Sequence, residues 1–113
     1  MLLFNGGSLV DANQTALWGA KSGPWGKGAA PKGLYYMTAC FKWSDPDPPY
    51  TDAEGFCWFA SIEPMFPTER SGFGIHPDGN VPGTRGCIGI TTPDSKPCYN
   101  FLRAAESVYV VVM

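Results

Sequence analysis

One cysteine and one histidine lie close together in the second half of the chain. His76 is the only histidine, and it lies eleven positions before Cys87. A thiol attacks a carbonyl carbon efficiently only as a thiolate, and a nearby imidazole is the usual group that takes its proton. Gly86 allows a tight backbone turn before Cys87, which leaves amide N–H groups to stabilise an oxyanion. These residues predict a nucleophile, Cys87, and its base, His76.

A structural role for the same residues stays open at this point. Cysteine is among the most frequently buried residue types, so a cysteine and a histidine in one segment can serve packing alone. Asp78, two positions after the histidine, could orient His76 or bind a substrate amine. Its place directly before Gly79 favours a turn-forming role instead.

Composition indicates a single domain of residues 1–113, rich in β-structure. The 113 residues include 14 glycines and 11 prolines, and 14% are aromatic, which is typical of a turn-rich β protein rather than a helical bundle. The net charge is −2 and the pI is about 5.1, with Lys and Arg scattered along the chain. This charge distribution argues against a nucleic-acid-binding protein.

The first residues do not resemble an export signal. They lack a basic region, a long apolar run and a small-residue cleavage site. No run approaches the ~20 apolar residues that a membrane span requires. We expect a protein that is made in the cytoplasm without a signal peptide, does not insert into membranes, and reaches an extracytoplasmic target by another route.

The other three cysteines do not indicate a metal site. The cysteine spacings contain no CxxC pair, and a single histidine cannot complete a common zinc site. We expect Cys40, Cys57 and Cys98 to be reduced, although pairing between cysteines stays open. No metal and no cofactor are predicted.

Turn signals divide the chain into short strands and one helix. Gly6-Gly7 predicts a two-residue hairpin between the first two strands. Thr92 and Pro93 predict the start of a helix over 93–105, with Thr92 as the cap. The expected strands are 2–5, 8–11, 15–20, 33–43, 55–62, 72–76, 87–90 and 107–113.

The order of these features resembles a known family. A strand that ends in His76 is followed by a loop, the sequence Thr84-Arg85-Gly86-Cys87-Ile88, a capped helix and a Val-rich strand. This arrangement resembles the YkuD-type L,D-transpeptidase catalytic domain, whose members act on peptidoglycan stem peptides through a cysteine. The resemblance is clearest over 72–113 and weaker over 22–35. It implies a mainly β, small sandwich-like or barrel-like fold with one α-helix after the catalytic cysteine.

The resemblance also implies roles for individual residues. Cys87 would be the nucleophile, and His76 the general base and later the general acid. The backbone carbonyl of Pro77 would orient His76. Gly86 and the Cys87 amide would contribute to the oxyanion site, and Thr84 matches the hydroxyl position of the motif.

The chain departs from the family pattern at two positions. Relatives commonly have His directly before the Gly-Cys pair, where this chain has Arg85, and Arg or Asn two positions after the cysteine, where it has Gly89. We expect Arg85 to bind a substrate carboxylate or to stabilise the thiolate, the alternative being a solvated surface side chain.

Aromatic and amide side chains could line a cleft for the substrate peptide. The candidates are Tyr35 and Phe73, and beyond them Trp25 and Asn80. Aromatic residues in a β-structure more often serve packing, so that role stays open for each of them.

These expectations lead to a reaction class. We expect cysteine-dependent cleavage of stem peptides, as an L,D-carboxypeptidase or endopeptidase of the bacteriolytic phage-endolysin or antibacterial-effector type, acting in the periplasm or cell wall. Such an enzyme would be a monomer that depends on a holin-type release route or has an immunity protein as partner. The alternatives are an L,D-transpeptidase that forms cross-links or exchanges D-amino acids, and a non-catalytic phage or wall-associated module.

Overall fold

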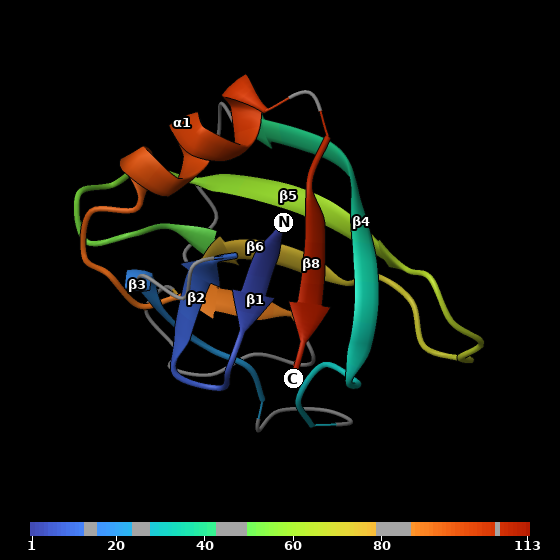
Figure 1. Ribbon diagram of the computed structural model, residues 1–113. Helices are drawn as coiled ribbons and strands as arrows, with labels where there is room; N and C mark the ends of the chain where they lie inside the picture. Colours follow the sequence, from blue (N-terminus) through green and yellow to red (C-terminus); the bar gives the residue numbers. More distant parts are fainter. Residues whose placement is uncertain (13–15, 24–27, 43–49, 79–86, 106) are drawn as a thin grey trace.

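A closed β-barrel with one helix packed against it forms the fold (Figure 1). The computed structural model describes residues 1–12, 16–23, 28–42, 50–78, 87–105 and 107–113. Within them, eight strands follow each other around the barrel in the order β1-β2-β3-β7-β6-β5-β4-β8. The expected fold, mainly β with one helix after Cys87, is confirmed.

The strands are short apart from β4, and the helix lies between the last two strands of the sequence. Their bounds are β1 Leu2–Phe4, β2 Ser8–Asp11, β3 Ala16–Lys21, β4 Gly33–Lys42, β5 Trp58–Pro64, β6 Gly74–Pro77, β7 Ile88–Ile90, α1 Lys96–Ala104 and β8 Tyr109–Val112.

Two of the strand pairs are parallel, and both matter for the architecture. β1 pairs with β8, which closes the barrel between the first and the last of the described strands. β6 pairs with β7, the two strands that carry the candidate chemistry. The other six neighbouring pairs among the described strands are antiparallel.

The predicted hairpin between β1 and β2 is confirmed. The Asn5 N–H donates to the Ser8 carbonyl at 3.2 Å, and the Asn5 side-chain oxygen accepts from the N–H groups of Gly7 and Ser8. Gly6 has a φ of 93°, a conformation that glycine adopts without the steric cost of a side chain.

The interior of the barrel is apolar, and α1 packs against the same core. Ile75, Ile88 and Ile90 are at most 1% exposed. Cys98 and Leu102 of α1 are fully buried. The four cysteines are all among the described residues, and no disulfide joins them.

The helix begins later than its sequence signals indicate. Thr92 does not cap it, because its hydroxyl oxygen accepts a hydrogen bond from the Gly19 N–H at 3.1 Å. The residue before the helix is Ser95, whose N–H and hydroxyl both donate to the Asp52 carboxylate. Contacts with distant segments therefore override the local Thr-Pro signal.

The start of β5 also differs from the prediction. A strand was expected over 55–62, but residues 52–56 form a turn around the Asp52 carboxylate, which accepts from the N–H groups of Glu54 and Phe56 at 2.9 Å each. Thr51 and Cys57 form an isolated bridge across this turn. The strand proper begins at Trp58.

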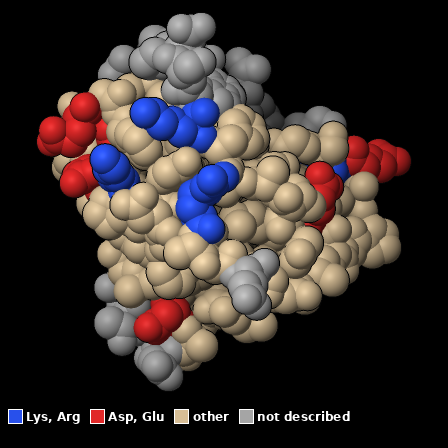
Figure 2. All heavy atoms as spheres, turned by 90° about the horizontal axis from the view of Figure 1, so that it is seen from above, with Lys and Arg blue, Asp and Glu red and all other residues tan. Residues whose placement is uncertain are grey.

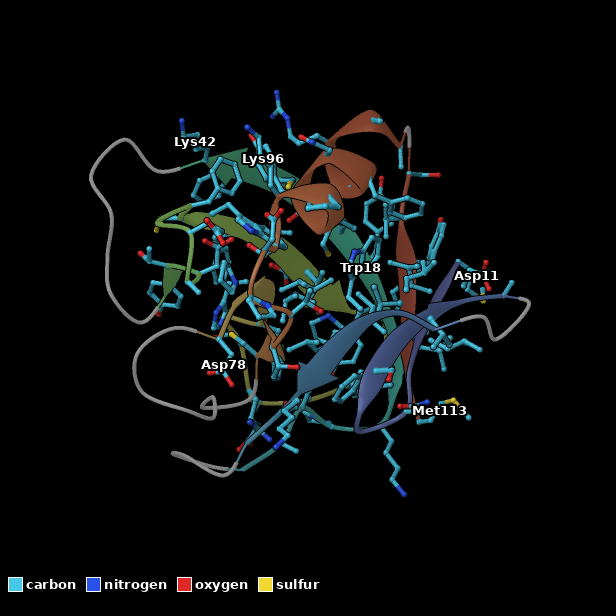
Figure 3. The ribbon with its side chains drawn as sticks, turned by 90° about the vertical axis from the view of Figure 1, so that its left-hand side faces the viewer. Asp11, Trp18, Lys42, Asp78, Lys96 and Met113 are labelled. Carbon is cyan, nitrogen blue, oxygen red and sulfur yellow. The ribbon has the colours of Figure 1, made fainter. Side chains whose placement is uncertain are left out.

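Basic side chains gather on the face that carries α1, with acidic side chains toward its edges (Figure 2). The ammonium groups of Lys42 and Lys96 lie 5.6 and 5.5 Å from the centre of the Phe56 ring. Trp18 lies beneath α1 and meets Phe101 edge-on at 5.5 Å (Figure 3). No helix in the described part of the chain is long and apolar enough to cross a membrane.

Candidate active site

The parallel pairing of β6 and β7 brings the two predicted reactive residues onto neighbouring strands. Ile75 lies opposite Ile88, and His76 lies opposite Gly89. Cys87 directly precedes Ile88, so in this parallel pair it lies at the level of Gly74, the residue before Ile75. Since side chains alternate along a strand, His76 points to the face opposite Ile75, whose side chain belongs to the core.

His76 is held by a hydrogen bond to its own strand. It is 5% exposed, and its Nδ1 lies 2.7 Å from the carbonyl oxygen of Pro77. Because a carbonyl oxygen only accepts, Nδ1 must carry the proton of this bond. In the neutral imidazole, the lone pair then lies on Nε2, the nitrogen that remains for a proton transfer.

Two aromatic rings enclose the imidazole. The Phe59 ring is stacked on it, with centres 5.8 Å apart and planes at 10°. The Tyr50 ring meets it at 89°, with centres 4.6 Å apart. Sequence reasoning missed both residues. Phe59 comes from the neighbouring strand β5, and only the pairing of β5 with β6 could have pointed to it; Tyr50 carried no signal.

Gly74 leaves room for this arrangement. A Cβ atom at position 74 would overlap the Phe59 ring, with ring atoms Cε1 and Cε2 only 2.6 Å away. Real Cβ atoms do not approach carbon so closely. The absence of a side chain at Gly74 therefore lets Phe59 lie across β6 and reach His76.

Cys87 is half-buried and is fixed by contacts on both sides. Its Sγ lies 3.6 Å from the Gly72 carbonyl oxygen. The Ser22 hydroxyl donates to the Cys87 carbonyl at 2.7 Å and accepts from the Ala30 N–H at 2.9 Å. Ser22, at the end of β3, thus ties the cysteine backbone to the segment before β4.

Burial favours the neutral form of both groups. It raises the pKa of the Cys87 thiol above its ordinary value, although a hydrogen bond from the Gly74 backbone opposes this. Burial also lowers the pKa of His76, against opposing effects from the Pro77 carbonyl and the Asp78 carboxylate. At neutral pH the described surroundings therefore favour a protonated Cys87 thiol and a neutral His76 imidazole.

The two aromatic residues expected to bind substrate are placed in the core. Tyr35 is fully buried, its hydroxyl donates to the Pro31 carbonyl at 2.7 Å, and burial raises its pKa to about 12. Phe73 is 3% exposed and meets Tyr35 edge-on at 5.4 Å. Their burial favours the packing role that the sequence analysis left open, because neither ring offers a face to a ligand.

The remaining predicted positions lie outside the described residues. They are Thr84, Arg85, Gly86, Trp25 and Asn80. Gly89, the other position at which the chain departs from the family pattern, is described and lies in β7 opposite His76.

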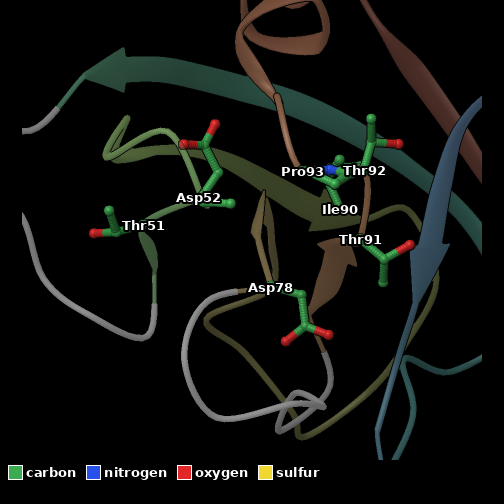
Figure 4. A pocket seen from close by; sticks show the side chains of 8 residues that line it. Thr51, Asp52, Asp78, Ile90, Thr91, Thr92 and Pro93 are labelled. Atoms are coloured by element: carbon green, nitrogen blue, oxygen red, sulfur yellow. The ribbon is translucent and has the colours of Figure 1, made fainter.

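A small pocket lies at the ends of β6 and β7 away from Cys87. Its volume is about 200 Å³, and it is framed by Thr51–Ala53, by Asp78 and by Ile90–Pro93 (Figure 4). The Asp78 N–H donates to the Ile90 carbonyl at 2.9 Å, which fixes the backbone there. In the described part of the chain, no cluster of three or more His, Cys, Asp or Glu residues could hold a metal ion.

Comparison with known proteins identifies the family. The family model for the YkuD L,D-transpeptidase catalytic domain matches residues 1–110, which is nearly the whole chain. A comparison with curated proteins found no match. The chain therefore belongs to the YkuD family, the catalytic domain of cysteine-dependent L,D-transpeptidases that act on peptidoglycan.

Proposed function

We propose that Cys87 and His76 perform acyl transfer on peptidoglycan stem peptides, with water as the acceptor. The observation that carries this proposal is the 2.7 Å contact between His76 Nδ1 and the Pro77 carbonyl. This contact leaves Nε2 of His76 as the proton acceptor. His76 lies on β6, which runs parallel to β7, the strand that begins directly after Cys87. Orienting the base in this way is what a third group does in other nucleophile–base pairs.

The reaction begins at a peptide bond between an L-centre and a D-centre. The Cys87 sulfur forms a bond to the carbonyl carbon of the L-centre, and its proton passes to His76 Nε2. As the C–N bond breaks, the imidazolium returns this proton to the departing amine. Water then attacks the thioester, which releases the acid and restores the thiol. This outcome corresponds to an L,D-carboxypeptidase or endopeptidase.

The pKa directions support proton transfer during attack rather than a preformed ion pair. The pKa of Cys87 is raised and that of His76 is lowered, so the charged pair is disfavoured before the substrate binds. General-base catalysis of this kind contributes about 10²–10⁴-fold. Amide donors at Gly86 and Cys87 would stabilise the oxyanion, an effect of about 10²–10³-fold for each donor.

The short connection between the two residues supports water as the acceptor. His76 and Cys87 are eleven positions apart in the sequence, which leaves little chain to cover the thioester. An uncovered thioester is open to hydrolysis. We place such a hydrolase among endolysins or secreted effectors that degrade the cell wall. The second candidate is exchange of D-amino acids or cross-linking, in which an amine replaces water.

Mass spectrometry of purified muropeptides distinguishes these outcomes. The wild-type protein and Cys87→Ala are each incubated with muropeptides, with and without an added D-amino acid. We expect the wild type to shorten stem peptides whether or not the D-amino acid is present, and Cys87→Ala to leave them intact. Products that contain the added D-amino acid would replace the hydrolase proposal by exchange. Intact muropeptides with the folded wild type would indicate a non-catalytic module.

A further inference from the structure

Asp52 lies at the centre of a hydrogen-bond network just before β5. Its Oδ1 accepts from the N–H groups of Glu54 and Phe56, which closes the local turn. Its Oδ2 accepts from the Ser95 N–H at 2.9 Å and from the Ser95 hydroxyl at 2.6 Å. One carboxylate thus shapes its own segment and fastens it to the start of α1.

The network continues into the core, which makes it rigid. Ser95 is fully buried, and its Oγ accepts from the Trp58 indole N–H at 2.8 Å. The Ala53 N–H donates to the Pro93 carbonyl at 3.2 Å, a second link between the same two segments. Buried polar groups that all have partners hold a single arrangement, because any other arrangement leaves one of them unsatisfied.

The fastened segment carries Tyr50, the residue that covers His76. Only Thr51 separates Tyr50 from Asp52, and Thr51 is itself bridged to Cys57. With Phe59 on one side of the imidazole and Tyr50 meeting it edge-on, the plane of the ring is fixed. The hydrogen bond to Pro77 fixes one nitrogen but does not alone exclude water from the ring.

We propose that Asp52 is a positioning residue, which holds Tyr50 against His76 and so keeps the imidazole oriented and shielded from water. The inference rests on the proposed role of His76 as the base. Asp52 takes no part in the chemistry; its carboxylate is engaged by Ser95 and by the turn. Its effect on the reaction passes through Tyr50.

Among the described residues, the ionisable groups shown to act on or contact His76 are the Asp78 carboxylate just after its own strand and the Tyr50 phenol from the segment before β5. The Cys87 thiol lies before the neighbouring strand β7. Asp52→Asn leaves all three in the sequence. Removing a negative charge would by itself lower the pKa of His76, whereas admitting water raises it toward its ordinary value. Loss of the charge and entry of water therefore predict opposite changes in the pKa of His76.

The test uses the single imidazole of the chain as a reporter. NMR titration of His76 is compared with kcat and KM on muropeptides for the wild type, Asp52→Asn, Tyr50→Leu and Tyr50→Phe. We expect Asp52→Asn and Tyr50→Leu to raise the His76 titration midpoint and to lower kcat by roughly 10- to 100-fold, the scale of a misplaced catalytic group. KM should change by less than about twofold, since ground-state binding is untouched. Tyr50→Phe keeps the ring and should recover most of the kcat that Tyr50→Leu loses.

Asp94→Asn is the matched control, because Asp94 also lies before α1 and accepts from the exposed Lys96 N–H. It should behave as the wild type. An unchanged His76 titration and kcat in folded Asp52→Asn would overturn the inference, as would an equal effect in Asp94→Asn. If Asp52→Asn does not fold, a wild-type titration in Tyr50→Leu overturns it instead. If His76→Ala proves active, the proposed function fails, while the titration still reports whether Asp52 holds the ring.

Discussion

The contact between Gly74 and Phe59 gives a quantitative test of how the site is built. In Gly74→Ala, the new Cβ would lie 2.6 Å from two atoms of the Phe59 ring. Carbon atoms pack at about 3.5–4.0 Å, so the ring must move by about 1 Å or more. Overpacking of this kind costs about 1–3 kcal/mol in the free energy of unfolding. At ~4 °C for each kcal/mol, the melting temperature should fall by about 4–12 °C.

The same displacement of the Phe59 ring should also lower kcat. Phe59 is stacked on the imidazole of His76, so a ring that moves away leaves the base less well oriented. A displacement of about 1 Å can cost up to 10²-fold in rate, and we expect kcat to fall by roughly 10- to 100-fold in Gly74→Ala. Urea unfolding and muropeptide kinetics on the same preparation measure both effects.

A double-mutant cycle isolates the cause. In a Phe59→Ala background there is no ring to displace, so adding Gly74→Ala should cost less than ~0.5 kcal/mol. Gly7→Ala is the matched control, because the nearest atom to its Cβ would be the Asn5 side-chain oxygen at 3.9 Å. An equal cost of Gly74→Ala with and without the Phe59 ring would refute the packing explanation.

Three further predictions concern Cys87, His76 and Arg85. Iodoacetamide should label half-buried Cys87 faster than the three buried cysteines, as peptide mapping would measure; equal labelling of all four would count against a reactive Cys87. Burial lowers the pKa of His76 in the folded state. The stability that the buried neutral imidazole contributes is therefore fully present above the unfolded-state pKa of about 6.5, and it is lost as the pH falls through the lower pKa of the folded state. Urea midpoints should therefore drop between about pH 7 and pH 5 in the wild type and less in His76→Asn, and parallel curves would contradict this. Arg85→Ala should lower kcat/KM by about 10- to 150-fold, and Arg85→Lys should mainly raise KM; unchanged kinetics would show a solvated side chain.

The sequence was sufficient to predict the elements whose signals are local. Gly6-Gly7 marked the hairpin because the turn depends on the backbone freedom of residues within it. The strands around His76 and Cys87 were predicted to within about two residues because apolar runs and flanking glycines mark them directly. The family resemblance rested on the same segment.

The features that could not be predicted depend on contacts between distant segments. The hydroxyl of Thr92 is taken by Gly19, 73 positions away, so the helix starts at Lys96 instead. The rings of Tyr50 and Phe59 reach His76 only because the barrel places their segments beside β6. The sequence left both a cleft-lining and a packing role open for Tyr35, and its burial in the barrel interior favours packing.

The parallel pairing of β6 and β7 has an evolutionary consequence. The backbone ladder between these strands sets the level of His76 relative to Gly89, and Cys87 follows from the start of β7. Descendants of this enzyme that keep this ladder can therefore exchange side chains around the site, and so adapt to different peptides, while His76 and the start of β7 stay at the same level.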